Sequence, residues 1–531
     1  MTRICRLAIV SAGLVALGAP AALSQPKQQQ LGKVHFETSC NAKAQKLFDR
    51  GMLYQHSFWY RASRRTFEEA LKADPKCGIA YWGIALGALE NPHVPPAAKN
   101  LAEGSAAIEA GKTLSAKTQR ERDYIDALAL FYADHDKVDH RTRVQTFLKA
   151  MEGLVQRYPK DDEAKIAYAI TLNVAAPPTD KTYANQLKGA ALLEPIFKRQ
   201  PQHPGIAHYL IHLHDYPPIA EKGLEAARRY AKIAAAAPHA QHMPSHIFTR
   251  VGYWQDSIAS NSAAARIAKE NNEGHDQLHA MDYLVYAHLQ LAQDKKAAAV
   301  IEEMNKVSGF SETFIAGPYA LAASPARYAV ERGDWKSAAE LSVRPSLLPQ
   351  IQAVTHFARA LGAARSGNAE AAKTDITKLT EIREKLKDAY WSNIVDIQRQ
   401  VAQAWVLYAE NKQDEALTAL AAAAEAEDKT EKHPVTPGPL APTRELYGVM
   451  LLERGMAAEA LAAFEATLKK EPNRLGAYLG AAKAASKIGD QAKAKQYGSK
   501  VIALTKEADT SRPQVQELKA LTTASAATPV R

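Results

Sequence analysis

The sequence has 531 residues, of which 47% are hydrophobic and 23% are charged. These shares, together with only 27 glycines and 27 prolines, exclude a wholly disordered chain and a collagen-like repeat. Three cysteines are too few for a disulfide-rich scaffold, and a formal net charge of +10 without a basic cluster interleaved with aromatic residues argues against nucleic acid as a partner.

Residues 1–24 have the three parts of a secretory signal peptide. Arg3 and Arg6 make the start basic, an apolar run extends to Leu23, and small residues around Ser24 offer a cleavage site. Glycine and proline interrupt the run, which is shorter than the roughly 20 apolar residues of a membrane span. An uncleaved membrane anchor is the alternative. We expect a cleaved leader, no membrane span in the mature chain, and a periplasmic or secreted protein.

Beyond the leader the sequence is typical of helices. Apolar residues recur at helical spacing, alanine is abundant, and no stretch alternates as a strand does, so we expect an all-α fold. A pattern of small, aromatic and proline residues occurs near both ends of the chain. It comprises Gly51, Tyr54, Ala62, Phe67, Ala70 and Pro75 in one copy, and Gly448, Gly455, Ala460, Phe464 and Pro472 in another.

This pattern resembles the tetratricopeptide repeat (TPR), in which small residues let two helices pack closely and large residues fill the gap between pairs. The resemblance implies a TPR-like α-solenoid of about twelve helical hairpins between residues 41 and 506. Another class of helical repeat is the alternative. The predicted organisation is a main array at 25–428 with a histidine-rich centre at 203–288, a proline-rich loop at 429–442, a C-terminal TPR pair at 443–508 and a polar tail at 509–531.

The cysteines that remain after cleavage of the leader are Cys40 and Cys77. They are 37 residues apart, about one repeat, and we expect Cys40 to precede the first helix of its hairpin and Cys77 to begin the first helix of the next. Because neighbouring repeats start side by side, the two Cα atoms can lie within about 7 Å. An oxidising compartment preserves disulfides. We therefore predict a disulfide between Cys40 and Cys77.

The distribution of histidine is the strongest functional signal. Ten of the 17 histidines lie between His203 and His288, where an even distribution would place about three. His208 and His212 are four residues apart, so they share one face of a helix and lie about 6 Å apart along its axis. The sequence therefore concentrates imidazoles on particular helix faces.

Two further pairs follow. His242 and His246 are also four residues apart, but Pro244 lies between them, and proline favours the first turn of a helix. We expect a helix to begin near Pro244, which leaves His239 and His242 on the incoming loop. On the next hairpin, His279 and Asp282 are three residues apart. The TPR resemblance implies that these positions face the concave groove of the solenoid.

Three interpretations of this cluster are open. The imidazoles can line a polar groove and hydrogen-bond to one another, or hold an anionic ligand together with Arg250. They can also bind a divalent transition metal, Zn, Cu or Fe, because imidazole suits all three. The candidate ligands are His208, His212, His242 and His246, with His239, His279 and Asp282 as further ligands. Candidates for outer contacts or a cap are Asp215, Tyr286, Arg250 and His433.

The segments HSFWY (56–60), HYLIH (208–212), HMPSHIF (242–248) and HPVTPGP (433–439) also resemble those of uncharacterised exported bacterial TPR proteins. That resemblance implies the architecture and a shared site. The function we expect is an exported binding or interaction protein with a histidine-rich concave site for a protein partner or a small ligand. The alternatives are a metal-dependent enzyme, either hydrolase or oxidoreductase, and a plain protein-interaction scaffold of the cell envelope.

Overall fold

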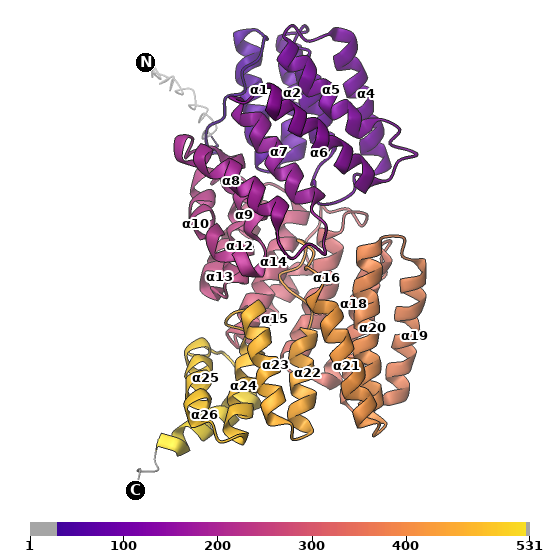
Figure 1. The fold of residues 1–531 in the computed structure, drawn as a ribbon, viewed down its shortest axis with the longest axis vertical. Coiled ribbons are helices and arrows are strands. Elements are labelled where there is room, and N and C mark those ends of the chain that lie inside the picture. The colour runs from indigo at the N-terminus through magenta and orange to yellow at the C-terminus, as the bar shows by residue number, and fades with distance from the viewer. Residues whose placement is uncertain (1–28, 527–531) are drawn as a thin grey trace, which may run out of the picture.

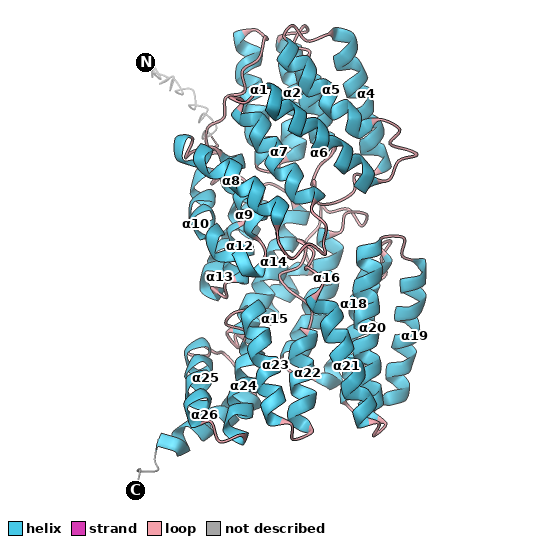
Figure 2. Ribbon diagram, in the orientation of Figure 1, coloured by secondary structure: helices cyan, strands magenta, loops and turns pink. Residues whose placement is uncertain are grey.

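The computed structural model describes residues 29–526, with side chains as far as Lys519. The predicted signal peptide, residues 1–24, lies outside the described residues. Within them every regular element is a helix, numbered α1 to α26 with one 3-10 helix, η1 (Figure 2). The predicted all-α fold is therefore confirmed. None of the described helices combines the length and the apolar character needed to cross a membrane.

The helices pair as antiparallel hairpins. The first six are α1 (Ala42–His56) with α2 (Tyr60–Ala73), α3 (Ile79–Ala88) with α4 (Ala98–Leu114), α5 (Gln119–Tyr132) with α6 (His140–Arg157), α7 (Asp162–Ala175) with α8 (Ala184–Arg199), α9 (Pro204–His214) with α10 (Leu224–Ile233) after η1 (Pro217–Gly223), and α11 (Pro238–His242) plus α12 (Pro244–Arg250) with α13 (Trp254–Glu270).

The second six hairpins complete the array. They are α14 (Gly274–Gln290) with α15 (Asp294–Met304), α16 (Ala316–Glu331) with α17 (Trp335–Ala339), α18 (Pro349–Arg365) with α19 (Ala369–Lys385), α20 (Ala389–Ala409) with α21 (Gln413–Asp428), α22 (Thr443–Glu453) with α23 (Ala457–Lys470), and α24 (Leu475–Lys487) with α25 (Gln491–Leu504). The twelve hairpins in the described chain match the number expected from the repeat.

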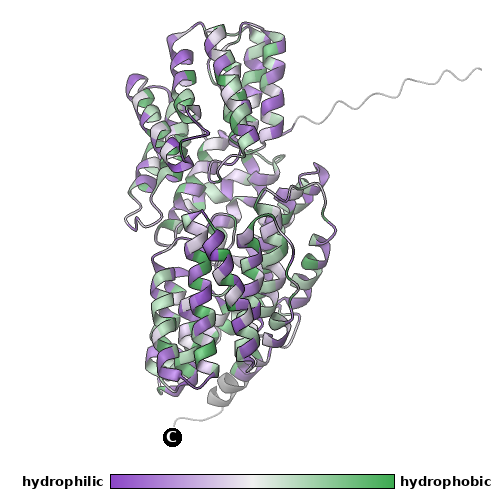
Figure 3. Cartoon of the chain, turned by 90° about the vertical axis from the view of Figure 1, so that its right-hand side faces the viewer, coloured by the Kyte–Doolittle hydropathy of each residue, from purple (hydrophilic) through white to green (hydrophobic). Residues whose placement is uncertain are grey.

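Successive hairpins stack into an α-solenoid (Figure 1), in which α14, α16, α18 and α20 contact one another in order. The helices carry both apolar and polar positions (Figure 3), as amphipathic helices do. The small residues of the repeat have a clear packing role. A Cβ atom on Gly51 or Gly83 would lie 2.7 or 2.6 Å from the ring of Phe67. Gly480 approaches the ring of Phe464 in the same way, so both ends of the array use one packing rule.

The superhelix curves far enough for distant hairpins to meet, and α1 contacts α9. The turn after α1 therefore reaches the histidine-rich helices. His56 Nε2 lies 3.1 Å from Glu163 Oε2, and His203 Nε2 lies 2.8 Å from Glu163 Oε1. Burial alone would raise the pKa of Glu163, but His203 and His56 outweigh it and hold that pKa well below its usual range. This carboxylate ties α1, α7 and the start of α9 together.

Cys40 and Cys77 form the predicted disulfide, with their Cα atoms 4.9 Å apart. Each cysteine lies just before the first helix of its hairpin, α1 or α3. Replacing both by serine is expected to lower the free energy of unfolding by about 4 kcal/mol, because the closed loop of 37 residues restricts the unfolded chain. Chemical denaturation of the double variant and the oxidised wild type measures this. Equal stabilities, with two free thiols in the non-reduced wild type, would contradict it.

The proline-rich segment 429–442, here called the strap, is irregular as predicted but is not an exposed linker. It crosses the inner face of the array beside α14 and α16 (Figure 1). Arg327 Nη1 donates to the carbonyl oxygen of Pro439 at 2.9 Å, and the Tyr283 hydroxyl donates to that of Thr436 at 3.2 Å. Val435 and Leu440 are buried. The strap is thus packed into the molecule.

The C-terminal hairpins at 443–508 are anchored to the main array. Arg474 is buried and lies 2.8 Å from Glu331 Oε1 and 2.7 Å from Glu445 Oε2. Within the predicted polar tail at 509–531, residues 513–526 form helix α26 (Pro513–Ala526). This helix is held because Arg512 pairs with Asp294.

Candidate metal centre

All six histidines predicted as ligands come together, in two neighbouring groups of three. Helices α9, α11, α12 and α14 supply them, and the candidate ligand atoms within each group lie within 4.8 Å of one another. The two groups adjoin, because the rings of His212 and His246 have centroids 6.1 Å apart. Group 1 is His208, His212 and His239, and group 2 is His242, His246 and His279.

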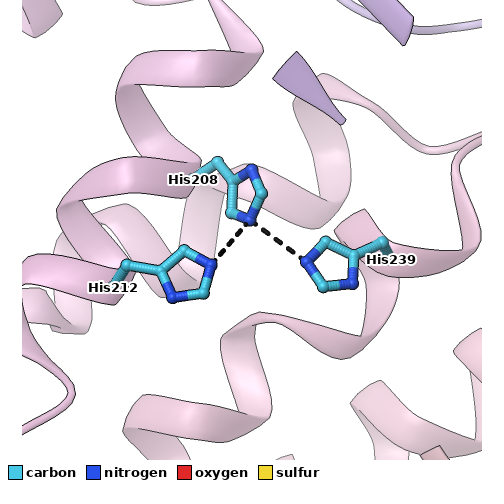
Figure 4. Close-up of side chains that lie close together, drawn as sticks. All are labelled: His208, His212 and His239. Atoms are coloured by element: carbon cyan, nitrogen blue, oxygen red, sulfur yellow. Dashed lines mark hydrogen bonds between the residues drawn. The ribbon is translucent and has the colours of Figure 1, made fainter. Parts of the chain in front are cut away.

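In group 1 the three rings converge on one another (Figure 4). His208 Nε2 lies 3.1 Å from His212 Nε2 and 3.2 Å from His239 Nε2. His208 Nδ1 lies 2.7 Å from the carbonyl oxygen of His56, which can only accept, so Nδ1 carries the proton. In the neutral ring the lone pair is therefore on Nε2 and faces the other two imidazoles.

In group 2, hydrogen bonds to side-chain oxygens determine which ring nitrogen carries the proton in two of the histidines. His246 Nδ1 donates to Asp215 Oδ2 at 2.8 Å. His242 Nδ1 lies 2.7 Å from the side-chain oxygen of Asn261, whose amide nitrogen donates to the carbonyl of Ser257 at 2.8 Å and so fixes the amide orientation. Both Nδ1 atoms are thus donors. The two Nε2 atoms, 3.0 Å apart, then face each other with lone pairs and no proton between them.

Burial keeps these rings neutral. It lowers the pKa of His208 to about 3 and holds that of His242 well below the usual range, with neighbouring histidines adding to the effect for His242. A shared proton is therefore disfavoured near pH 7, whereas an electron-pair acceptor would resolve the repulsion between the lone pairs. A tetrahedral zinc ion with Zn–N bonds of 2.0–2.1 Å places its nitrogens about 3.3 Å apart. The three contacts of 3.0–3.2 Å are close to that value, and the other pairs of ligand atoms within each group lie within 4.8 Å.

Asp215 contacts three side chains at the edge of group 2. Besides His246, it accepts from Arg250 Nε at 2.7 Å and from Lys432 Nζ at 3.2 Å. Burial alone would raise the pKa of Asp215, but Lys432 and Arg250 outweigh it and hold that pKa well below its usual range. Burial also lowers the pKa of Lys432 to about 8. Asp215 is therefore a carboxylate that orients His246, as outer carboxylates do at histidine metal sites.

Two predicted residues lie elsewhere. Asp282 faces α16, where its Oδ1 accepts from the Ser324 hydroxyl at 3.1 Å and lies 3.8 Å from Arg327. Tyr286 contacts the C-terminal hairpins, where its hydroxyl accepts from Arg474 Nη1 at 3.1 Å. Neither belongs to the histidine groups. His239 and His242, expected on a loop, lie on the short helix α11, although the next helix does begin at Pro244 as predicted.

Other residues at the site were not predicted. Phe58 stacks on His239 with ring centroids 5.0 Å apart, and the Tyr283 hydroxyl lies 3.5 Å from His246 Nε2. Phe58 belongs to the segment HSFWY, and Lys432 precedes the predicted cap residue His433, so both lie within or beside residues that the sequence marks as candidates for the site. Asn261 has no such neighbour, and a single asparagine on a helix does not by itself indicate a functional site.

A small cavity of about 60 Å³ lies among the imidazoles, and the strap closes part of it through His433. Such a volume has room for ions and a few water molecules. Histidines of both groups line it, among them His212, His239, His246 and His279. Residues of both groups therefore line one small cavity in the solenoid. The sequence had instead predicted an open concave groove.

Comparison with known proteins adds little to this picture. No protein-family model matches the sequence, and no curated protein is similar to it. Solved helical structures similar to this chain include a human IFIT1 dimer with PPP-AAAA, with a TM-score of 0.39, 11% identity, and coverage of 88% of this chain and 97% of that one. Another is the TPR domain of P58(IPK), with a TM-score of 0.23, 12% identity, and coverage of 85% and 99%.

Proposed function

We propose that this protein is an exported binding protein that holds two divalent transition-metal ions in its solenoid, one in each three-histidine group. The observation that supports this most is the contact between His242 Nε2 and His246 Nε2. Their Nδ1 protons are committed to Asn261 and Asp215, so a neutral pair has no hydrogen bond to make across that 3.0 Å separation. A cation between the lone pairs turns a repulsive arrangement into two bonds.

The donor set narrows the choice of metal. Three imidazole nitrogens suit Zn, Cu or Fe and are a poor match for Mg²⁺ or Ca²⁺, which prefer oxygen. Three protein ligands also leave one position of a tetrahedral ion open for water or another small ligand. A site that serves only structure would normally be closed by a fourth protein ligand. The centre is therefore suited to binding a further molecule at the metal.

Export is the second part of the proposal. The leader pattern at 1–24 carries it, and the disulfide between Cys40 and Cys77 fits an oxidising compartment. Detection of a mature chain that begins after Ser24 in the envelope or medium fraction tests this part.

Elemental analysis of chain purified from its native compartment without chelators tests the metal. We expect close to two equivalents of transition metal per chain, and their loss in the double variant His208→Ala, His246→Ala. The control is His356→Ala, which removes a histidine that contacts Asp375 on the neighbouring helix, away from both groups. Absence of metal from the wild type, both as isolated and after dialysis against each metal, would overturn the proposal.

A further inference from the structure

We infer that a second, larger cavity beside the metal centre is its ligand chamber, and that it takes a flat, neutral aromatic molecule carrying two or more hydroxyl groups. The inference rests on the proposed function, because the ligand in this chamber would face the open coordination positions of the proposed metal ions. The chamber measures about 510 Å³, within the range of small-molecule sites in proteins.

The chamber adjoins the histidine groups directly. It shares His93, His212 and His433 with the small cavity among the imidazoles. His212 belongs to group 1, and the ring of His93 lies 4.5 Å from that of His212, centroid to centroid, so one wall of the chamber is formed by group 1 and its neighbour. Other boundaries of the chamber are proline-containing segments between helices, 92–95, 175–178 and the strap.

Part of the chamber wall is aromatic. Trp391 and Tyr390 line it at the start of α20, and the ring of His433 lies 5.1 Å from that of Trp391. Ile315 and Leu348 extend this wall with aliphatic surface. A flat apolar body can pack on such a wall, since aromatic rings favour offset-stacked and edge-to-face contacts.

Four buried side-chain atoms on the chamber wall have no hydrogen-bond partner, namely two oxygens and the imidazole nitrogens His93 Nε2 and His140 Nδ1. Gln186 Oε1 and Glu431 Oε2 are buried acceptors without a partner, and both residues line the chamber. A buried acceptor is costly to leave unpaired, so a ligand that donates hydrogen bonds is favoured there. Hydroxyl groups on the ligand supply those donors.

Charge favours a neutral ligand. Glu431 Oε1 is already paired with Lys181 at 2.6 Å. Asp215 is paired with both Arg250 and Lys432. The buried charges named here thus each have an opposite charge beside them, so the buried part of the wall favours neither an anion nor a cation.

The probe is resorcinol, a dihydroxybenzene whose meta hydroxyls do not chelate a metal, with 1,3-dimethoxybenzene as the analogue that cannot donate. Titration calorimetry on the full chain, metal-free and zinc-loaded, is expected to show resorcinol binding at least about tenfold more tightly than the ether, the factor typical of a hydrogen bond. Gln186→Leu is expected to lower resorcinol affinity about tenfold. The matched control is Gln398→Leu, since Gln398 Oε1 is also buried without a partner but lines a neighbouring cavity and not the chamber.

Glu431→Gln is the second variant and is expected to weaken resorcinol binding too. Two variants at different residues keep the test valid if one of them fails to fold. Equal affinities for resorcinol and its ether, or a Gln186→Leu chain that folds and binds as wild type does, would overturn the inference. Zinc content measured on the same samples separates the two proposals. Zinc without selective resorcinol binding removes the chamber alone, whereas Gln186-dependent binding without zinc keeps the chamber and removes the metal centre.

Discussion

Zinc is expected to raise the free energy of unfolding of the metal-free chain by about 4 kcal/mol for each ion bound, at a free zinc concentration about 1,000 times the dissociation constant. The reason is that the folded chain gathers three imidazoles at each group, and the unfolded chain does not. Burial of those imidazoles in neutral form leaves them ready to bind metal at pH 7. Thermal unfolding followed by circular dichroism, with and without zinc, measures the increase.

His246→Ala is expected to lose the part of this increase that comes from group 2 and to keep the part from group 1. The control is His356→Ala, because His356 Nδ1 lies 2.7 Å from Asp375 much as His246 Nδ1 lies 2.8 Å from Asp215. Both variants lose a histidine–aspartate contact, but only His246→Ala loses a metal ligand. Equal gains from zinc in the two variants would show that group 2 does not bind the ion.

What could be predicted from the sequence is what local spacing determines. The helical hairpins follow from small residues such as Gly51 that meet large ones such as Phe67. The contact between His208 and His212 follows from their separation by one helical turn. The disulfide follows from the length of one repeat. Each of these depends on neighbouring residues or neighbouring repeats, so the pattern in the chain was sufficient.

The division of the histidines into two groups depends on how the helices of neighbouring hairpins cross, and the sequence could not supply it. His239 joins His208 because α11 meets α9, not because of its spacing from His242. Asp282 shows that a small angle around a helix decides which neighbours a side chain contacts. Three residues along a helix turn the side chain by 300°, so Asp282 points about 60° away from His279 and reaches α16.

The strap shows the same limit at longer range. Its four prolines exclude a helix, and this part of the prediction is confirmed. Its burial, however, depends on Arg327 and Tyr283, which lie more than 100 residues earlier in the chain and donate to strap carbonyls. Nothing within the strap indicates these partners. The sequence therefore offered His433 only as a candidate cap in a proline-rich loop, and the structure places it in the lining of both cavities.

Asp215→Asn is expected to lower the free energy of unfolding by about 3–5 kcal/mol, because it leaves Arg250 and Lys432 as two buried cations without a carboxylate. It is also expected to weaken zinc binding at group 2 by about 10–100-fold, because His246 loses the charged acceptor that orients its ring. Denaturant unfolding of the metal-free chain measures the first effect, and competition with a zinc-binding dye measures the second.

Two companion variants separate these effects. Asp294→Asn removes another buried carboxylate, the one paired with Arg512, so it is expected to cost similar stability while zinc affinity stays unchanged. Adding Lys432→Met to Asp215→Asn removes one of the two unpaired cations and is expected to restore part of the stability but none of the zinc affinity. If Asp215→Asn binds zinc as tightly as the wild type, Asp215 serves only to neutralise Arg250 and Lys432. The orientation of His246 would then come from packing alone.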